Sequence, residues 1–245
     1  MTKIIYVHGM GNPSAGESYD LMGRTIIEAA QGRASQSDWR ECYWADITQP
    51  DQDALFTLIG RNGLFHSYLF TSLGDIVAYC RPEHFPNKYD EIQQRFVDSV
   101  NWCRDNSDPN GQTPLIVIGK SLGSVIASDG LWEMLRAGSF PANLVLHAFF
   151  TLGSPMALFA LRFGLSNFNQ PITPQVWINY YYDPDPIGFP LKSLPGYTSV
   201  VTRDELLSPG TLMRQIVATI PGLNIRSHDW YLDDPRVINE IASHL

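Results

Sequence analysis

The sequence predicts an α/β fold in which a mainly parallel sheet is covered by helices on both faces. Strand-like apolar runs alternate with segments of helical periodicity along the 245 residues, and this alternation is typical of parallel sheets. Hydrophobic residues make up 44% of the chain, which is enough to fill one large core. Residues 114–127 join an apolar run, a glycine-flanked turn and an apolar-periodic stretch without a break. We therefore expect a single domain over residues 1–245.

The strands are predicted from short apolar runs. Lys3–Val7 and Leu115–Ile118 are nearly continuous runs, as expected of strands buried on both faces. Glu41–Ala45 is predicted to be the second strand along the chain. The remaining predicted strands are Leu144–Leu152, Val176–Tyr182 and a weaker one at Thr198–Thr202.

The helices are predicted from apolar side chains that recur every three or four residues. This spacing occurs in Glu17–Ala30, in Asp90–Cys103 and in Leu122–Arg136. A last helix is predicted after Asp234 and Pro235, because aspartate is favoured at a helix N-cap and proline in the first turn.

Residues 119–123 read Gly-Lys-Ser-Leu-Gly and lie between a predicted strand and a predicted helix. A G-x-S-x-G sequence in this context predicts a sharp turn that leaves the central serine strained and exposed at the edge of the sheet. We expect the two glycines because Cβ atoms on either side of the serine would collide across the turn. Ser121 is therefore a candidate nucleophile, provided that a nearby base accepts its proton.

The same residues contain the Gly-Lys-Ser that ends a phosphate-binding P-loop. That motif requires a glycine where this chain has Pro114, and residues 115–118 are apolar like a strand. The P-loop interpretation is therefore disfavoured. A chance G-x-S-x-G in an ordinary turn is the other alternative, and the strand and helix around it argue against that.

Composition restricts the classes of function. The net charge of −8 and the pI of about 5.1 give no support to nucleic-acid binding. The three cysteines, Cys42, Cys80 and Cys103, are too few and too irregular for a disulfide framework or a zinc site. We expect a cytoplasmic protein without metal, cofactor, signal peptide or transmembrane segment. Contact with a lipid surface stays open.

Two segments do not fit the alternation of strands and helices. Thr48–Pro86 is rich in leucine, phenylalanine and tyrosine, and Pro155–Pro174 carries a similar set of apolar residues. One interpretation is that they are surface helices packed on the core. The other is that they form a lid, or an acyl pocket, over the serine. The sequence leaves both interpretations open.

Residues 7–11 read Val-His-Gly-Met-Gly at the end of the first predicted strand. An H-G-x-G sequence at this point is typical of the loop that gives one backbone N–H to an oxyanion hole. We therefore expect the N–H groups of Met10 and Leu122 to form such a hole. His8 is expected to shape the loop and not to act as the base. An ordinary glycine-rich turn would be favoured if the serine turn were absent.

The candidate acid follows Val176–Tyr182, since ligands and chemistry gather at the carboxyl ends of parallel strands. Asp183 and Asp185 both lie there in a proline-stiffened turn, and the residues alone leave both as candidates. The order Ser…Asp…His predicts the base at His228, just before the last helix. The other histidines fit this order less well: His66 and His84 precede the serine, His147 lies in a predicted strand and His244 is at the tail.

Together these segments resemble the bacterial serine esterases of the α/β-hydrolase fold, in their lipase-like branch. The resemblance rests on G-x-S-x-G at 119–123, T-L-G-S-P at 151–155, W-x-N-x-Y…D-P-[VI] at 177–187 and S-H-x-x-Y at 227–231. It covers nearly the whole chain and implies an α/β-hydrolase fold with inserted helical cap segments. It also implies a catalytic triad of Ser121, His228 and Asp185, the aspartate of D-P-[VI]. Lys120 stands where the family most often has histidine, which puts a positive charge near the turn and leaves the acyl preference open.

Three functional hypotheses follow. The leading one is a hydrolase that cleaves a carboxylic ester, from a small molecule or a lipid, through an acyl-enzyme. An acyltransferase with the same triad differs only in the second acceptor. A non-catalytic binding module on the same fold is the third, because a fold alone does not establish function. The sequence specifies neither the acyl group, nor the alcohol, nor the oligomeric state.

Overall fold

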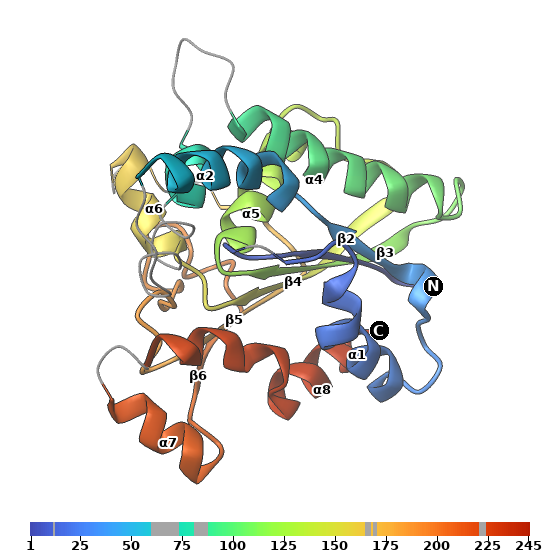
Figure 1. The fold of residues 1–245 in the computed structure, drawn as a ribbon. Coiled ribbons are helices and arrows are strands. Elements are labelled where there is room, and N and C mark those ends of the chain that lie inside the picture. The colour runs from blue at the N-terminus through green and yellow to red at the C-terminus, as the bar shows by residue number, and fades with distance from the viewer. Residues whose placement is uncertain (12, 60–73, 81–87, 165–167, 169–170, 221–223) are drawn as a thin grey trace.

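A computed structural model describes the chain except for residues 12, 60–73, 81–87, 165–167, 169–170 and 221–223 (Figure 1). In the described residues, six parallel strands form one sheet in the order β2-β1-β3-β4-β5-β6. The strands are β1 (Lys3–Val7), β2 (Trp39–Cys42), β3 (Thr113–Lys120), β4 (Leu144–Leu152), β5 (Val176–Tyr182) and β6 (Arg203–Leu207).

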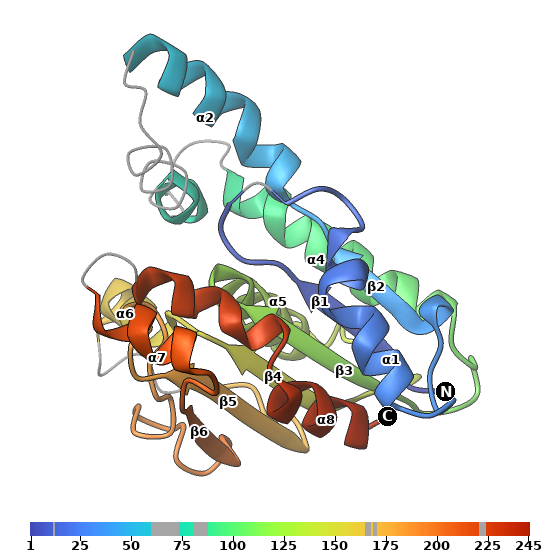
Figure 2. The same ribbon diagram turned by 60° about the horizontal axis from the view of Figure 1, so that its bottom comes forward.

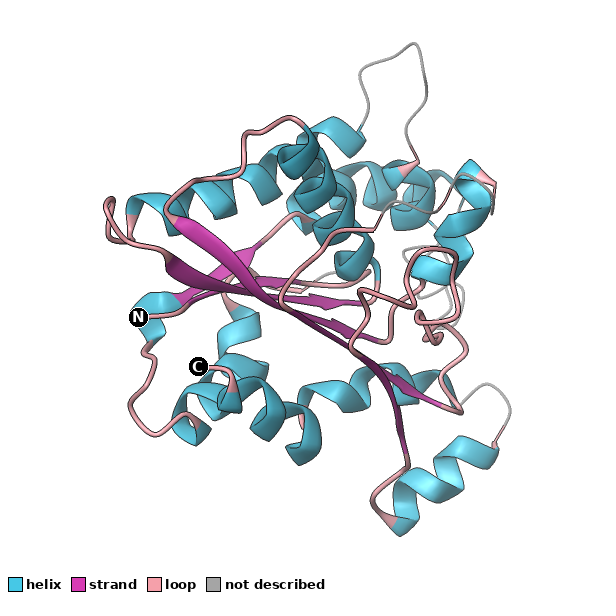
Figure 3. Cartoon of the chain, turned by 180° about the vertical axis from the view of Figure 1, so that it is seen from behind, coloured by secondary structure: helices cyan, strands magenta, loops and turns pink. Residues whose placement is uncertain are grey.

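Helices cover both faces of this sheet (Figures 1 and 3). One face carries α2 (Ala45–Ile59), α4 (Lys88–Asp105) and α5 (Leu122–Arg136). The other face carries the π-helical turn η1 (Tyr19–Gly23), α1 (Arg24–Ala29) and α8 (Pro235–Ser243). The short helices α6 (Met156–Phe163), α7 (Leu212–Thr219) and η3 (Asn224–Leu232) lie toward the carboxyl ends of the strands (Figure 2). The short helix η2 (Gln36–Asp38) precedes β2 in the chain.

The core is divided into two apolar layers by the sheet. Val117 of β3 faces the layer under α4 and α5, whereas Ile116 and Ile118 face the layer under α1 and α8. Successive side chains of a strand point to opposite faces. A strand buried on both faces therefore needs consecutive apolar residues, and this is why these runs could be recognised in the sequence.

Several predicted elements are confirmed with the same bounds, namely β1, β4, β5 and α5. Two strands were predicted at the wrong positions. The second strand is Trp39–Cys42, and Ala45 begins α2. Residues 198–200 belong to turns, with the Val200 N–H bonded to the Tyr197 carbonyl, and the strand follows at Arg203–Leu207. This last strand lies at the edge of the sheet and is largely charged, so it carries no apolar run to recognise.

The expected cap segments are described only in part. Thr48–Pro86 contributes α2 as far as Ile59 and helical residues 74–79, and residues 60–73 and 81–86 lie outside the described residues. Pro155–Pro174 contributes α6. Among the described residues, no helix has both the length and the apolar character needed to cross a membrane.

The centre of the sheet contains a topological switch point between β1 and β3. From β1 the chain continues outward to β2, and from β3 it continues to β4 on the opposite side. Ligands bind at the carboxyl ends of strands at such a point. The glycine-rich loop after β1 and the serine turn after β3 both lie there.

Candidate active site

Ser121 occupies the turn between β3 and α5 and is the N-cap of that helix. Its φ of 53° and ψ of −130° lie in a region that a residue with a side chain rarely adopts. Such a conformation costs roughly 1–3 kcal/mol and persists because its surroundings fix it. Here the Ser121 N–H donates to the Leu152 carbonyl at 2.8 Å. The predicted strained turn is therefore present on a parallel, two-sided sheet, and the chain has the α/β-hydrolase fold.

The glycines of this turn make room for different neighbours. A Cβ on Gly119 would lie 2.5 Å from the Ser124 Cα, which is the collision across the turn that the sequence predicted. A Cβ on Gly123 would lie 2.2 Å from the Val7 carbonyl oxygen at the end of β1. The expectation for Gly123 therefore needs correction. Its lack of a side chain lets α5 approach the end of β1 instead of relieving the turn itself.

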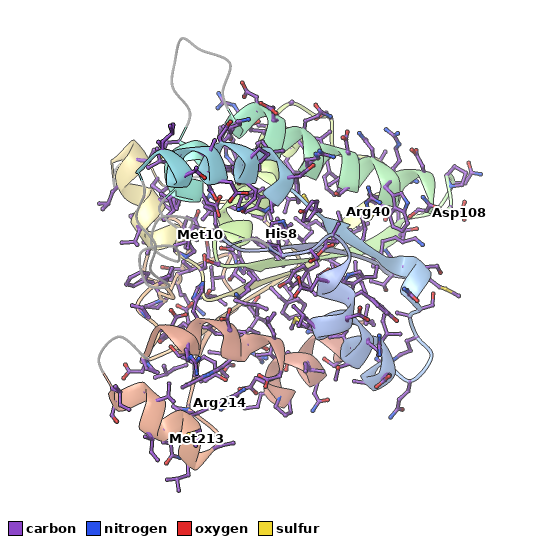
Figure 4. The ribbon with its side chains drawn as sticks, viewed as in Figure 1. His8, Met10, Arg40, Asp108, Met213 and Arg214 are labelled. Carbon is purple, nitrogen blue, oxygen red and sulfur yellow. The ribbon has the colours of Figure 1, made fainter. Side chains whose placement is uncertain are left out.

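The loop after β1 reaches Ser121 in the same way. A Cβ on Gly9 would lie 2.7 Å from the Ser121 Cβ. Met10 follows, partly buried against the core, and Figure 4 shows His8 and Met10 between α2 and the sheet. Leu122 is the first residue of α5, where backbone N–H groups lack helical acceptors and favour negative charge. Both expected oxyanion donors thus belong to segments adjoining Ser121, and their role stays a prediction.

His8 is fixed by both of its ring nitrogens. The Trp44 N–H donates to Nε2 at 3.1 Å, so Nε2 carries no proton. Nδ1 therefore carries the proton and donates to the Gly9 carbonyl at 2.8 Å. Burial lowers the pKa of His8 to about 4, with the Gly9 hydrogen bond opposing this shift and the charge of Lys120 adding to it. A neutral imidazole with a hydrogen bond at each ring nitrogen suits a residue that shapes the loop.

His228 and Asp185 lie against each other although they are far apart in the sequence. The His228 Nδ1 is 2.9 Å from Asp185 Oδ2 and 3.1 Å from Oδ1. Asp183, the other candidate acid, is exposed. A carboxylate only accepts hydrogen bonds, so we assign the proton to Nδ1. The Nε2 atom of His228 then carries the lone pair that a general base needs.

The Asp185 carboxylate has two further donors, which sequence reasoning did not single out. The Tyr231 hydroxyl donates to Oδ2 at 2.6 Å, and the Ile187 N–H donates to Oδ1 at 2.9 Å. Burial alone raises the pKa of Asp185, but the hydrogen bonds from His228, Tyr231 and Ile187 outweigh it and hold that pKa below its usual value. Asp185 is therefore ionised at neutral pH.

Two glycines make space for this acid and base. A Cβ on Gly153 would lie 2.9 Å from Asp185 Oδ2 and 3.0 Å from His228 Cε1, and one on Gly188 would lie 2.7 Å from Asp185 Oδ2. Gly153 directly follows Leu152, the residue whose carbonyl holds Ser121. The end of β4 therefore contacts both the serine turn and the acid–base pair.

An ion pair also joins Lys120, which precedes Ser121, to Asp229, which follows His228. Lys120 Nζ pairs with Asp229 Oδ1 at 2.5 Å. The Lys120 side chain is 11% exposed and that of Asp229 is 68% exposed. The positive charge expected near the turn is therefore paired with a carboxylate beside His228.

Ser121 and His228 are both almost fully buried, with 1% and 4% of their surface exposed. The expectation of an exposed serine is therefore wrong, because the loop after β1 lies against Ser121 at Gly9. In the described part of the chain, Ser121 Oγ and His228 Nε2 are buried atoms without a hydrogen-bond partner. One is a hydroxyl donor and the other a nitrogen acceptor. Buried polar atoms usually have partners, so this pair requires an explanation.

A hollow of about 330 Å³ lies beside these residues at the switch point. Its lining includes Gly9, Met10, Glu17, Lys120, Asp229 and Leu232. The described aromatic residues of the expected cap at 155–174 lie elsewhere: Phe159 is buried in the core and Phe168 stacks on Tyr197 at 5.3 Å. An acyl pocket formed by the cap segments stays a prediction.

No family model matches the chain, and no curated protein matches it. Among solved structures it is similar to Aspergillus fumigatus lipase B, at 12% identity and a TM-score of 0.39. That similarity covers 97% of this chain and 50% of the lipase, so the chain spans about half the length of that protein.

Proposed function

We propose that this protein is a serine hydrolase that cleaves a carboxylic ester, with Ser121 as nucleophile, His228 as general base and Asp185 as the orienting acid. The observation that carries the proposal is the pair of buried, unpartnered atoms Ser121 Oγ and His228 Nε2. Proton transfer from a serine to a histidine uses these two atoms. Catalytic hydrogen bonds are often incomplete before substrate binds.

The reaction proceeds in two halves. Ser121 Oγ attacks the ester carbonyl carbon and its proton moves to His228 Nε2, while the carbonyl oxygen becomes an oxyanion facing the N–H groups of Met10 and Leu122. When the tetrahedral adduct collapses, the alcohol leaves with the proton from His228 and an acyl-enzyme remains. Water then attacks that acyl group, gives its proton to His228, and releases the free acid as the proton returns to Ser121.

Asp185 acts through His228. Its carboxylate keeps the proton on Nδ1, which leaves Nε2 as the acceptor for the Ser121 proton, and its negative charge stabilises the imidazolium that forms. The hydrogen bonds from Tyr231 and Ile187 hold the carboxylate in this orientation.

The four sequence motifs support placing the protein in the lipase-like branch of bacterial serine esterases, acting on a small-molecule or lipid ester. The hollow beside Lys120 and Asp229 supports a substrate that reaches this edge of the sheet. Cys42, Cys80 and Cys103 are free thiols, which supports a reducing, cytoplasmic location.

The test is a panel of p-nitrophenyl esters of increasing acyl length, assayed with the wild-type protein and with Ser121→Ala. Loss of Ser121 should lower turnover by on the order of 10³-fold or more. Ser199→Ala, at an exposed serine, is the matched control and should keep wild-type turnover. Turnover retained by a folded Ser121→Ala protein would refute the triad.

Two further readouts separate the rival hypotheses. Labelling of Ser121 by a fluorophosphonate distinguishes an enzyme from a binding module. Release of free acid in water without an added alcohol distinguishes a hydrolase from an acyltransferase.

A further inference from the structure

A buried carboxylate outside the proposed triad lies close to the loop after β1. Asp75, on helical residues 74–79, is 0% exposed. Its Oδ2 accepts the Gly11 N–H at 3.0 Å, and its Oδ1 accepts the Thr48 hydroxyl at 2.9 Å and the Gln52 amide at 2.6 Å. All three donors are neutral groups. Burial raises the pKa of Asp75 despite these hydrogen bonds.

These contacts join three segments that are distant in the sequence. Gly11 ends the His-Gly-Met-Gly loop and has a φ of +112°. Thr48 and Gln52 lie one turn apart on α2. A Cβ on Gly74 would lie 3.1 Å from the Gln52 amide nitrogen, so the glycine lets the helix of Asp75 approach α2 closely. A carboxylate suits this point because both of its oxygens accept, and the Gly11 donor uses one oxygen while the two donors of α2 use the other.

The orientation of Met10 depends on the two peptide planes that flank it. A peptide unit is planar and trans, so its C=O and N–H point in opposite directions. The Gly9 carbonyl accepts from His8 Nδ1, and this fixes the plane that contains the Met10 N–H. The Gly11 N–H donates to Asp75, and this fixes the next plane. His8 and Asp75 together therefore fix the backbone on both sides of Met10.

We infer that Asp75 is a positioning residue for the oxyanion hole, which holds the loop through the Gly11 N–H so that the Met10 N–H points at the developing oxyanion. The inference rests on the proposed function, and Asp75 itself touches no substrate. Because Thr48 and Gln52 share its carboxylate, Asp75 also ties α2 to this loop.

The test compares Asp75→Asn with Asp53→Asn, an exposed carboxylate on α2, in the full-length protein. Asparagine has the same shape as aspartate, but it has only one acceptor oxygen. Its NH₂ group would face groups that are themselves hydrogen-bond donors. We expect kcat per fluorophosphonate-titrated site to fall on the order of 10-fold to 10²-fold, with KM within about threefold, because an oxyanion donor acts mainly in the transition state. Affinity for a trifluoromethyl ketone, which forms an oxyanion on Ser121, should fall by the same factor. Asp53→Asn should change neither quantity.

A role in folding alone would lower the number of titrated sites and leave kcat per site and ketone affinity unchanged, and that result would overturn the inference. If Asp75→Asn yields no folded protein, Thr48→Val removes one donor and should lower kcat and ketone affinity together by about threefold; unchanged values would overturn the inference. Turnover that depends on Ser121 but not on Asp75 refutes this inference alone. A wild-type protein without esterase activity or labelling refutes the proposed function as well.

Discussion

Lys120 and Asp229 form an ion pair that links the residue before Ser121 to the residue after His228. The two residues are 109 positions apart in the sequence. Both residues line the hollow beside the candidate site, together with Gly9 and Met10. The ion pair therefore connects the serine turn to η3 independently of Gly153, which lies close to Asp185 and His228.

We predict that this ion pair contributes to alignment and not to the chemical step. Because Asp229 is well exposed, the coupling in unfolding free energy between Lys120→Met and Asp229→Asn should be below about 1 kcal/mol in a double-mutant cycle. Esterase turnover of each variant should stay within about tenfold of wild type. Urea denaturation and ester assays measure the two quantities. A loss of turnover as large as that of Ser121→Ala would show instead that Lys120 takes part in the reaction.

Asp185→Asn should lower kcat on the order of 10³-fold or more while the protein stays folded. An asparagine can donate to His228 Nδ1, which moves the imidazole proton to Nε2 and removes the acceptor that Ser121 needs. The matched control is Asp183→Asn, because Asp183 lies in the same turn but is exposed. If Asp183→Asn abolished turnover and Asp185→Asn did not, the acid would be assigned to the wrong position of the turn.

Tyr231→Phe should reduce both stability and turnover. The change removes a 2.6 Å hydrogen bond to Asp185 and leaves the Tyr182 N–H without its 3.0 Å acceptor. The pKa of Asp185 should then rise, because one of the hydrogen bonds that oppose the effect of burial is lost. We expect a loss of about 1–3 kcal/mol in unfolding free energy. The fall in kcat should be smaller than that of Asp185→Asn.

Tyr181→Phe, at a partly exposed tyrosine of β5, is the control for that variant. Equal effects of the two substitutions on stability and turnover would contradict a specific role for the Tyr231 hydroxyl. Thermal unfolding and steady-state assays are sufficient to compare them.

His8 should make stability depend on pH. Its pKa is about 4 in the folded protein, and an unperturbed histidine titrates near ~6.5. Between pH 4 and pH ~6.5 the unfolded state binds more protons than the folded state. The contribution of His8 to stability is therefore complete above pH ~6.5 and is lost as the pH falls toward 4. Unfolding free energy should therefore be about 2 kcal/mol lower at pH 5 than at pH 7.5 on account of this group.

The matched measurement is urea denaturation of wild type and His8→Gln at both pH values. The variant should be less stable at pH 7.5, since it loses the bonds to Gly9 and Trp44, but its stability should change less with pH. The same pH dependence in both proteins would mean that His8 does not titrate in this range.

The sequence by itself was sufficient for features that depend on neighbouring residues. Strands buried on both faces need consecutive apolar residues, so β1, β4 and β5 were predicted with their observed bounds. The serine turn could also be predicted, because a strand, two glycines and a helix start within a few residues leave one sharp geometry. The edge strand β6 has only one neighbour and carries a charged sequence, so no local pattern marked it.

Tertiary structure decided which distant side chains meet. The residues alone left both Asp183 and Asp185 open, and only the resemblance favoured Asp185. The contact of Asp185 with His228 depends on how the turn after β5 faces η3. The sequence predicted a positive charge near the turn at Lys120, and only the fold places Asp229 beside it. Asp75 gave no sequence signal, because its partners Gly11, Thr48 and Gln52 come from other segments. Backbone propensity and apolar periodicity act over a few residues, whereas hydrogen bonds and ion pairs between segments exist only once the sheet has brought those segments together.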